Sequence, residues 1–357
     1  MDAAAFEIEQ SFFPAYVELI TYLDSLGGQA TTDAGVWRLP DGEAYYAYLL
    51  AESTSTGMSP AEIHELGLRE VERIRAELYE LFAAMGYNTE QELEPLIQQA
   101  TREGGFVGGR GRILDEYYQL IAGAEERLDE MFDISPRAEL IVTGDQDGGG
   151  GYYLAASING ERPGAFHAGV GGQVPQYFMP TITYREGVPG HHFQIALSQE
   201  MDLPLFRNVL QYNGFVVGWA LDAERLAKEM GLYKDNPHGD VGRLELELLR
   251  AVRLVVDTGL HDQGWTRQEA RDYMIEAMGG AGWTHEVERY VVLPGQATGY
   301  MVGMLTILEQ RQKAQEALGE SFDIVAFHRV VLENGSLPLD ILKEVVNQWI
   351  ASVKEPT

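Results

Sequence analysis

Residues 59–86 read SPAEIHELGLREVERIRAELYELFAAMG and carry the strongest structural signal in the 357-residue sequence. Ser59 is a favoured N-cap residue, Pro60 suits the first helical position, and Glu62 completes a capping box. Apolar residues then recur with the three- and four-residue spacing of a helix, at Ile63, Leu66, Val71, Ile74, Leu78 and Leu81. The stretch therefore predicts a long amphipathic helix that ends near Gly86.

Helical patterns continue on both sides of a different central segment. A second capping box at Thr89–Glu92 predicts a short helix, and a third helix is expected over 114–131. Short strands are expected over 138–143 and 152–156, inside a stretch rich in glycine and proline. Further helices are expected over 181–200, 213–230, 239–260, 266–278, 295–317, 323–333 and 339–352.

These patterns predict a mainly α protein with one large helical domain over 1–357. Its expected parts are N-terminal helices in 1–135, a β or irregular insert in 136–180, and a helical part in 181–357 that carries the chemistry. A small β patch is expected around residues 138–180, where the short strands lie. The glycine-rich run between them is not a phosphate-binding loop, because it lacks the Gly-Lys-Ser/Thr ending.

The charge and composition exclude several classes of function. Asp and Glu number 55 against 26 Lys and Arg, for a formal net charge of −29, so nucleic acid and anionic membranes are not expected as partners. The chain has no cysteine, so any metal must be held by histidines and carboxylates. No apolar run approaches the ~20 residues of a membrane span, and the first residues lack a signal-peptide pattern, which predicts a cytoplasmic location. The oligomeric state stays open.

One segment groups side chains suited to acid–base chemistry. Tyr184–Gln194, YREGVPGHHFQ, places Glu186 close in sequence to His191 and His192, whereas ordinary core histidines are rarely grouped in this way. The Pro189-Gly190 pair interrupts any helix here, so which imidazole shares a face with Glu186 stays open.

The same segment resembles the signature His-Glu-x-x-Pro-Gly-His-His-x-Gln of a peptidase-like family known as domain of unknown function 885. Other blocks agree in order, and the resemblance runs from about residue 43 to the end. The family implies a helical zinc-peptidase-like scaffold in which two histidines and a glutamate surround zinc, and its members commonly have a longer N-terminal portion. The agreeing blocks are Ala61–Arg75, Gly218–Glu224, Arg250–His261, Glu286–Tyr290, Pro294–Gln296 and Gly335–Leu339.

The sequence departs from the family pattern at expected metal ligands. Arg185 replaces the first histidine of the signature, Val217 replaces a glutamate, and Asp222 replaces a tyrosine. Neither a protonated guanidinium nor a valine side chain can bind zinc. We therefore expect no resident cofactor, and a zinc ion on His191, His192 or Glu224 remains the alternative.

Many polar residues of the family pattern are nevertheless retained, which favours a working polar cleft. We predict an enzyme of hydrolase-like or lyase/cyclase-like type, with a metal-independent acid–base site for a small acidic or peptide-like amide or ester. Alternatives are a zinc-dependent amidase or peptidase and a non-catalytic binding protein. The predicted catalytic residues are Glu186, His191 and His192, and the predicted substrate-binding residues are Arg185, Asp222, Glu224, Arg289, Tyr290 and Gln296.

Two further expectations concern buried charge. Arg185 should pair with a carboxylate of Glu186, Asp222 or Glu224, or hold an anionic ligand, because an unpaired buried cation is costly. Arg250, Arg253 and Asp257 share one helical face and are expected to form a buried ion network.

Overall fold

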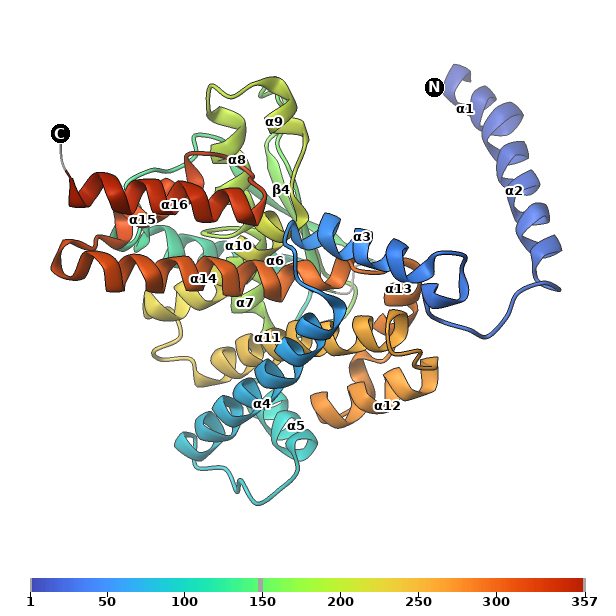
Figure 1. Ribbon diagram of the computed structural model, residues 1–357, viewed down its shortest axis with the longest axis horizontal. Helices are drawn as coiled ribbons and strands as arrows, with labels where there is room; N and C mark the ends of the chain where they lie inside the picture. Colours follow the sequence, from blue (N-terminus) through green and yellow to red (C-terminus); the bar gives the residue numbers. More distant parts are fainter. Residues whose placement is uncertain (1, 147–149, 356–357) are drawn as a thin grey trace. The chain divides into compact units, whose positions relative to one another are not determined.

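The computed structural model describes residues 2–146 and 150–355, and confirms a mainly α protein with small sheets (Figure 1). Part of the predicted glycine-rich loop, residues 147–149, lies outside the described residues. The chain divides into two compact units, Met1–Ala34 and Gly35–Thr357.

The first unit contains a helix that buries none of its described side chains. It comprises α1 (Asp2–Glu7), the π-helical turn η1 (Ile8–Phe12) and α2 (Phe13–Leu26). This helix presents many large apolar side chains to solvent, namely Phe6, Ile8, Phe12, Phe13, Tyr16, Val17, Leu19, Ile20, Tyr22, Leu23 and Leu26. The helix therefore has no core of its own.

The second unit begins with helices and contains the predicted long helix. Its first elements are η2 (Val36–Arg38), α3 (Gly42–Thr54), α4 (Pro60–Ala84), α5 (Leu93–Gly104), α6 (Arg110–Glu125) and η3 (Leu128–Glu130). The capping box of α4 forms as predicted: the Glu62 amide donates to Ser59 Oγ at 3.3 Å, and the Ser59 amide donates to Glu62 Oε2 at 2.8 Å. Ile63, Ile74 and Leu78 form its buried face.

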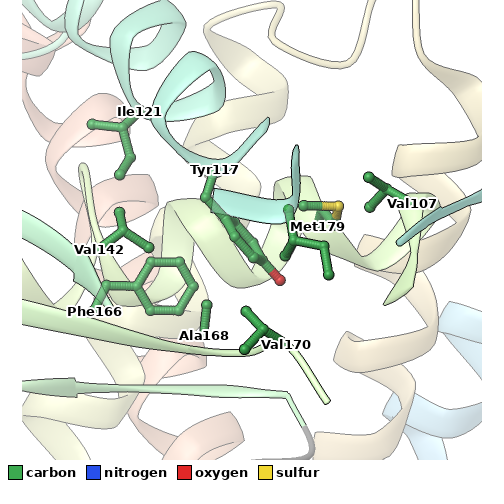
Figure 2. Packing of buried hydrophobic residues seen from close by; sticks show 9 residues of the cluster. Val107, Tyr117, Ile121, Val142, Phe166, Ala168, Val170 and Met179 are labelled. Atoms are coloured by element: carbon green, nitrogen blue, oxygen red, sulfur yellow. The ribbon is translucent and has the colours of Figure 1, made fainter. Parts of the chain in front are cut away.

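The central segment folds into two small sheets. β1 (Phe106–Gly108) pairs antiparallel with β5 (Gln173–Pro175), while β2 (Leu140–Asp145), β3 (Gly151–Leu154) and β4 (Gly164–Gly169) form a sheet of order β2-β4-β3. β4 is parallel to β2 and antiparallel to β3. Under this sheet, the rings of Tyr117 and Phe166 meet edge to face at 5.0 Å (Figure 2). The sheet is thereby fixed against α6.

Helices return after η4 (Gln176–Phe178), with one predicted helix divided in two. The segment predicted as a helix over 181–200 is α7 (Met179–Glu186) followed by α8 (His191–Glu200), so that prediction was wrong in detail. Gly190 has φ −82° and ψ −130°, outside the helical region, and a Cβ added there would lie 2.0 Å from the Arg185 carbonyl oxygen. The break therefore depends on a residue without a side chain.

The remaining elements complete the helical part. They are α9 (Leu205–Val209), α10 (Asn213–Glu229), α11 (Pro237–His261), α12 (Arg267–Met278), η5 (Ala281–Trp283), α13 (Glu286–Val292), η6 (Gln296–Thr298), α14 (Gly299–Leu318), η7 (Gly319–Ser321), α15 (Ile324–Leu332) and α16 (Leu339–Lys354). Every residue of α11 from Gly239 onward is buried, so α11 is the central helix of this unit. In Figure 1, α4 crosses α11, which it contacts extensively.

Two helices that carry site residues touch through glycines. A Cβ on Gly218 of α10 would lie 2.5 Å from the Gly303 Cα of α14, and a Cβ on Gly303 would lie 1.9 Å from the Gly214 carbonyl oxygen. Only backbones without side chains can approach this closely. The contact therefore fixes the spacing of α10 and α14.

Within the described residues, no single helix has both the length and the apolar composition needed to cross a membrane. The pair Glu286–Val292 and Gln296–Ser321, bent by 118°, meets those two criteria only when taken together.

Candidate functional site

An open cleft of about 910 Å³ lies in the second unit, between the β3 strand and the helices α7, α8, α11 and α14. Many titratable side chains line it, including Arg185, Glu186, His191, Arg250, Arg253 and Arg289. The sequence segment singled out for acid–base chemistry therefore opens onto the cleft.

The break between α7 and α8 brings its two ends to one place. Arg185 and Glu186 are the last residues of α7, and His191 is the first residue of α8. A continuous helix would distribute these three residues around its axis. With the chain turned at Gly187–Gly190, all three line the same cleft.

Arg185 pairs with two carboxylates, as predicted in part. It donates through Nη1 to Glu186, and its Nε lies 3.9 Å from Glu224 Oε1. Burial alone would lower the pKa of Arg185, but the carboxylate of Glu186 raises it, so the guanidinium stays charged. Glu224 also accepts a hydrogen bond from the Thr181 hydroxyl. The predicted pairing with Asp222 is not formed.

Glu186 and His191 are titratable groups held out of solvent. Only 2% of Glu186 is exposed, and burial raises the pKa of its carboxyl, although the charges of Arg185 and Arg250 oppose this. Burial, and then the same two arginines, lower the pKa of His191 well below its usual value. His191 is therefore neutral at pH 7, and within the described residues its buried Nδ1 has no hydrogen-bond partner.

Tyr300 on α14 is a site residue that the sequence reasoning missed. The guanidinium carbons of Arg185, Arg250 and Arg253 lie 5.6, 5.9 and 5.1 Å from its ring centroid. Burial alone would raise the pKa of Tyr300, but the charges of Arg185, Arg253 and Arg289 lower it to about 7. One sequence signal could have identified Tyr300, namely its position just after the Pro294–Gln296 block. A tyrosine in an apolar helix is more often part of the core, so this signal alone does not indicate a site residue.

The predicted ion network on α11 divides into two environments. Arg253 binds Glu286 at 2.7 Å and donates to the Tyr290 hydroxyl at 2.9 Å. Asp257 does not join them, because it accepts hydrogen bonds from the Tyr46 hydroxyl at 2.6 Å and the Gly295 amide at 2.9 Å.

Arg250 is the least satisfied of the cleft arginines. Its Nη1 donates to the Leu246 carbonyl oxygen at 2.9 Å, and in the described part of the chain its buried Nε has no partner. Burial and the neighbouring charges of Arg185 and Arg253 lower its pKa to about 10, although the carboxylate of Glu224 opposes this. An anion in the cleft would therefore supply a missing partner.

Two other predicted site residues lie away from the cleft lining. His192 exchanges a hydrogen bond with the Tyr153 hydroxyl at 3.1 Å, and burial lowers its pKa to about 4. Asp222 is 1% exposed, and its nearest charges are those of Arg225 and Arg311; burial raises its pKa to about 7. On α10, Asp222 thus points away from Arg185.

The last three predicted residues form a rim beside the cleft. Arg289 lines the cleft and donates to Gln296 Oε1 at 2.9 Å, while the Tyr290 hydroxyl donates to Glu286 at 3.2 Å. Gln296 in turn donates to Asn213 Oδ1 at 3.2 Å. These contacts hold Arg289 toward Tyr300.

The residues do not fit the zinc site that the family resemblance implies. Within the described residues, no three histidine, aspartate or glutamate side chains are grouped so that they could hold a metal ion. Arg185 occupies the position of one expected ligand, and its guanidinium faces the carboxylates that would otherwise face the metal. No step of the chemistry is derived through zinc.

Two solved structures resemble the fold. The first, described as the putative lipoprotein from Colwellia psychrerythraea, is 36% identical with a TM-score of 0.92. The second, a putative lipoprotein of unknown function from Shewanella oneidensis, is 18% identical with a TM-score of 0.76 and supports the fold alone. Each match covers 97% of this chain but only 62% and 65% of the respective relative, so the chain spans less than two thirds of their length.

The relatives correct one expectation and establish the family. The predicted cytoplasmic location is wrong, since both relatives are described as putative lipoproteins. No curated protein matches the sequence at a significant level. The family model described as "Bacterial protein of unknown function (DUF885)" matches residues 1–346. The chain therefore belongs to the DUF885 family.

Proposed function

We propose that this protein is an acid–base enzyme that acts, outside the cytoplasm and without a resident metal, on a small anionic amide or ester. One observation carries the proposal: Glu186, which is 2% exposed, lines a cleft beside Arg185 and neutral His191. Buried titratable groups that meet in a cleft with cations are typical of catalytic sites.

The arginines supply the binding part of the proposed reaction. Their planar guanidinium groups suit carboxylates and oxyanions, which accept two parallel hydrogen bonds. Arg250 retains an unpartnered nitrogen among the described residues, so it can bind the anionic group of the substrate. Arg185 lies next to Glu186 and can stabilise the negative charge that develops on the carbonyl oxygen.

Glu186 supplies the proton transfer. It takes a proton from the attacking water, whose oxygen bonds to the carbonyl carbon, and passes that proton to the nitrogen or oxygen of the leaving group as its bond breaks. The raised pKa of Glu186 favours the second of these transfers. His191 is neutral, and its Nδ1, which has no partner among the described residues, orients the water through a hydrogen bond.

The proposal is tested by turnover and by one isosteric change. The protein is incubated with dipeptides, N-acyl amino acids and their esters, and products are measured by mass spectrometry with and without a strong chelator. Glu186→Gln should reduce turnover by roughly 100-fold or more, because Gln keeps the shape but cannot transfer the proton. The exposed Glu320→Gln is the matched control.

Three results would contradict the proposal. They are full turnover by Glu186→Gln, loss of turnover in the chelator with recovery on adding zinc, and no turnover of any compound in the panel.

A further inference from the structure

One wall of the cleft has opposite charges at its two ends. Glu245, Leu246, Leu249, Arg250 and Arg253 line the cleft from α11, and their spacing places them on one face of that helix. At 1.5 Å per residue, Arg250 lies about 7.5 Å and Arg253 about 12 Å along the axis from Glu245. The two leucines form an apolar stretch between the charges.

The acidic end is a buried carboxylate without a positive partner in the described residues. Glu245 is 6% exposed and accepts hydrogen bonds from Trp283 Nε1 at 3.1 Å and the Tyr177 hydroxyl at 2.9 Å. Both donors are neutral, and burial raises the pKa of the Glu245 carboxyl although these two hydrogen bonds oppose it. A buried carboxylate without a counter-charge is costly, so a cationic ligand group would stabilise it.

Aromatic rings surround the same end. Phe178 and Trp283 line the cleft and meet edge to face at 6.2 Å, and Tyr177 stacks on Phe178 at 4.1 Å. The faces of aromatic rings attract ammonium groups, most strongly where water is excluded. A carboxylate set among aromatic rings is therefore suited to a protonated amine.

The basic end is suited to an anion. Arg250 is 5% exposed and has a buried Nε without a partner in the described residues. Arg253 has its charge balanced by Glu286, whereas Arg250 makes its one direct hydrogen bond to a neutral carbonyl oxygen. Arg250 is thus the first candidate for a ligand carboxylate.

We infer that Glu245, Trp283 and Phe178 form a subsite for the protonated amine of a zwitterionic ligand whose carboxylate binds at Arg250. This inference rests on the proposed function and specifies its substrate class. An extended peptide spans about 3.3–3.6 Å per residue, so two or three residues match the separation of the two charges. Short peptides with free ends fit both subsites.

Calorimetric titration of the full chain measures this directly with four probes: Ala-Ala-Ala, its N-acetyl form, its C-terminal amide, and a form with both ends blocked. Blocking either end should weaken binding at least about tenfold, because each change leaves one buried charge unpaired. In Glu245→Gln, N-acetylation of the peptide should no longer weaken binding, whereas the C-terminal amide should still weaken it. Arg250→Gln should show the reverse pattern, and Glu320→Gln should match the wild type.

Comparing the probes on the wild-type chain keeps the test decisive even if a variant fails to fold. Equal affinity for Ala-Ala-Ala and its N-acetyl form would overturn the amine subsite. The proposed function has a separate readout: if N-acyl amino acids are hydrolysed with full dependence on Glu186, it stands although the amine subsite fails.

Discussion

Arg185 places a positive charge between two buried carboxylates. Glu186 and Glu224 are both nearly fully buried, and two neighbouring carboxylates repel each other unless a positive charge lies between them. The guanidinium of Arg185 contacts both of them. A cation that belongs to the chain thus reduces the repulsion between Glu186 and Glu224.

Asp222 leads to a prediction about stability and pH. Its pKa in the folded chain is raised to about 7, above the usual value near 4, so the folded state binds the proton more tightly than the unfolded state. The stability that this proton contributes is present at low pH and is lost as pH rises through 7. Asp222→Asn should therefore have a higher free energy of unfolding than wild type, by about 4 kcal/mol at pH 8 and by about 1.5 kcal/mol at pH 5, at about 1.4 kcal/mol per pH unit between the two pKa values.

Chemical denaturation at the two pH values measures this difference. Asp235→Asn, at an exposed position, is the control and should leave stability nearly unchanged at both pH values. An Asp222→Asn variant that is less stable than wild type at pH 8 would show that the carboxylate is ionised and needed.

Tyr300 leads to a spectroscopic prediction. With its pKa lowered to about 7, it should lose its proton as pH rises through neutrality, far below an ordinary tyrosine. Near-ultraviolet tyrosinate absorbance should therefore show one early transition that Tyr300→Phe removes. Arg289→Gln removes one of the positive charges that lower this pKa, and should move the transition to higher pH. An unchanged transition in Tyr300→Phe would assign it to another residue.

At the scale of elements, the glycine contact between α10 and α14 positions Glu224 relative to Tyr300. Gly303→Ala places a methyl group 1.9 Å from the Gly214 carbonyl oxygen, so the helices must separate. We expect a loss of about 3 kcal/mol in the free energy of unfolding, together with an upward shift in the Tyr300 transition. Gly111→Ala is the matched control, since its Cβ would meet no atom within 4 Å. Wild-type values for Gly303→Ala would contradict the close contact.

Elements with local signals were predictable from the sequence. α4 follows from its capping box and apolar spacing, and α12, within one residue of its expected bounds, follows from the capping box at Thr266 and Glu269. At Gly187–Gly190, the sequence predicted that the helix is interrupted, but not that the two helices α7 and α8 bring their ends to one cleft. β4 was missed because its sequence, GAFHAG, lacks β-branched residues and forms a strand through tertiary contacts on both sides.

The candidate site was predictable only where it was local in sequence. Arg185, Glu186 and His191 lie within seven residues, and all three line the cleft. Tyr300 and Glu245 reach the same cleft through tertiary packing. Such packing leaves no characteristic residue spacing in a single sequence. From its place in a family block, Asp222 was predicted to pair with Arg185. In the structure, the positive charges that act on Asp222 are those of Arg225 and Arg311.

At the scale of the whole molecule, the two units differ in what they bury. Among its described residues the first unit buries only Ala34, so it has almost no core of its own, and its removal forfeits little burial of apolar surface. A chain of residues 35–357 should therefore melt within a few degrees of the full chain. Differential scanning calorimetry measures this, and a drop of roughly 10 °C or more would show that residues 1–34 stabilise the rest.

The four arginines of the cleft belong to a chain with a formal net charge of −29. At a distance, an approaching anion meets the negative field of the whole surface, and only inside the cleft does it meet the guanidinium groups. Dissolved ions screen the outer repulsion more than the inner attraction, because the cleft groups are buried. The capture rate of a purely anionic molecule should then rise with ionic strength, while that of a molecule without net charge should hardly change. The negative surface thereby makes molecules without net charge enter the cleft faster than anions.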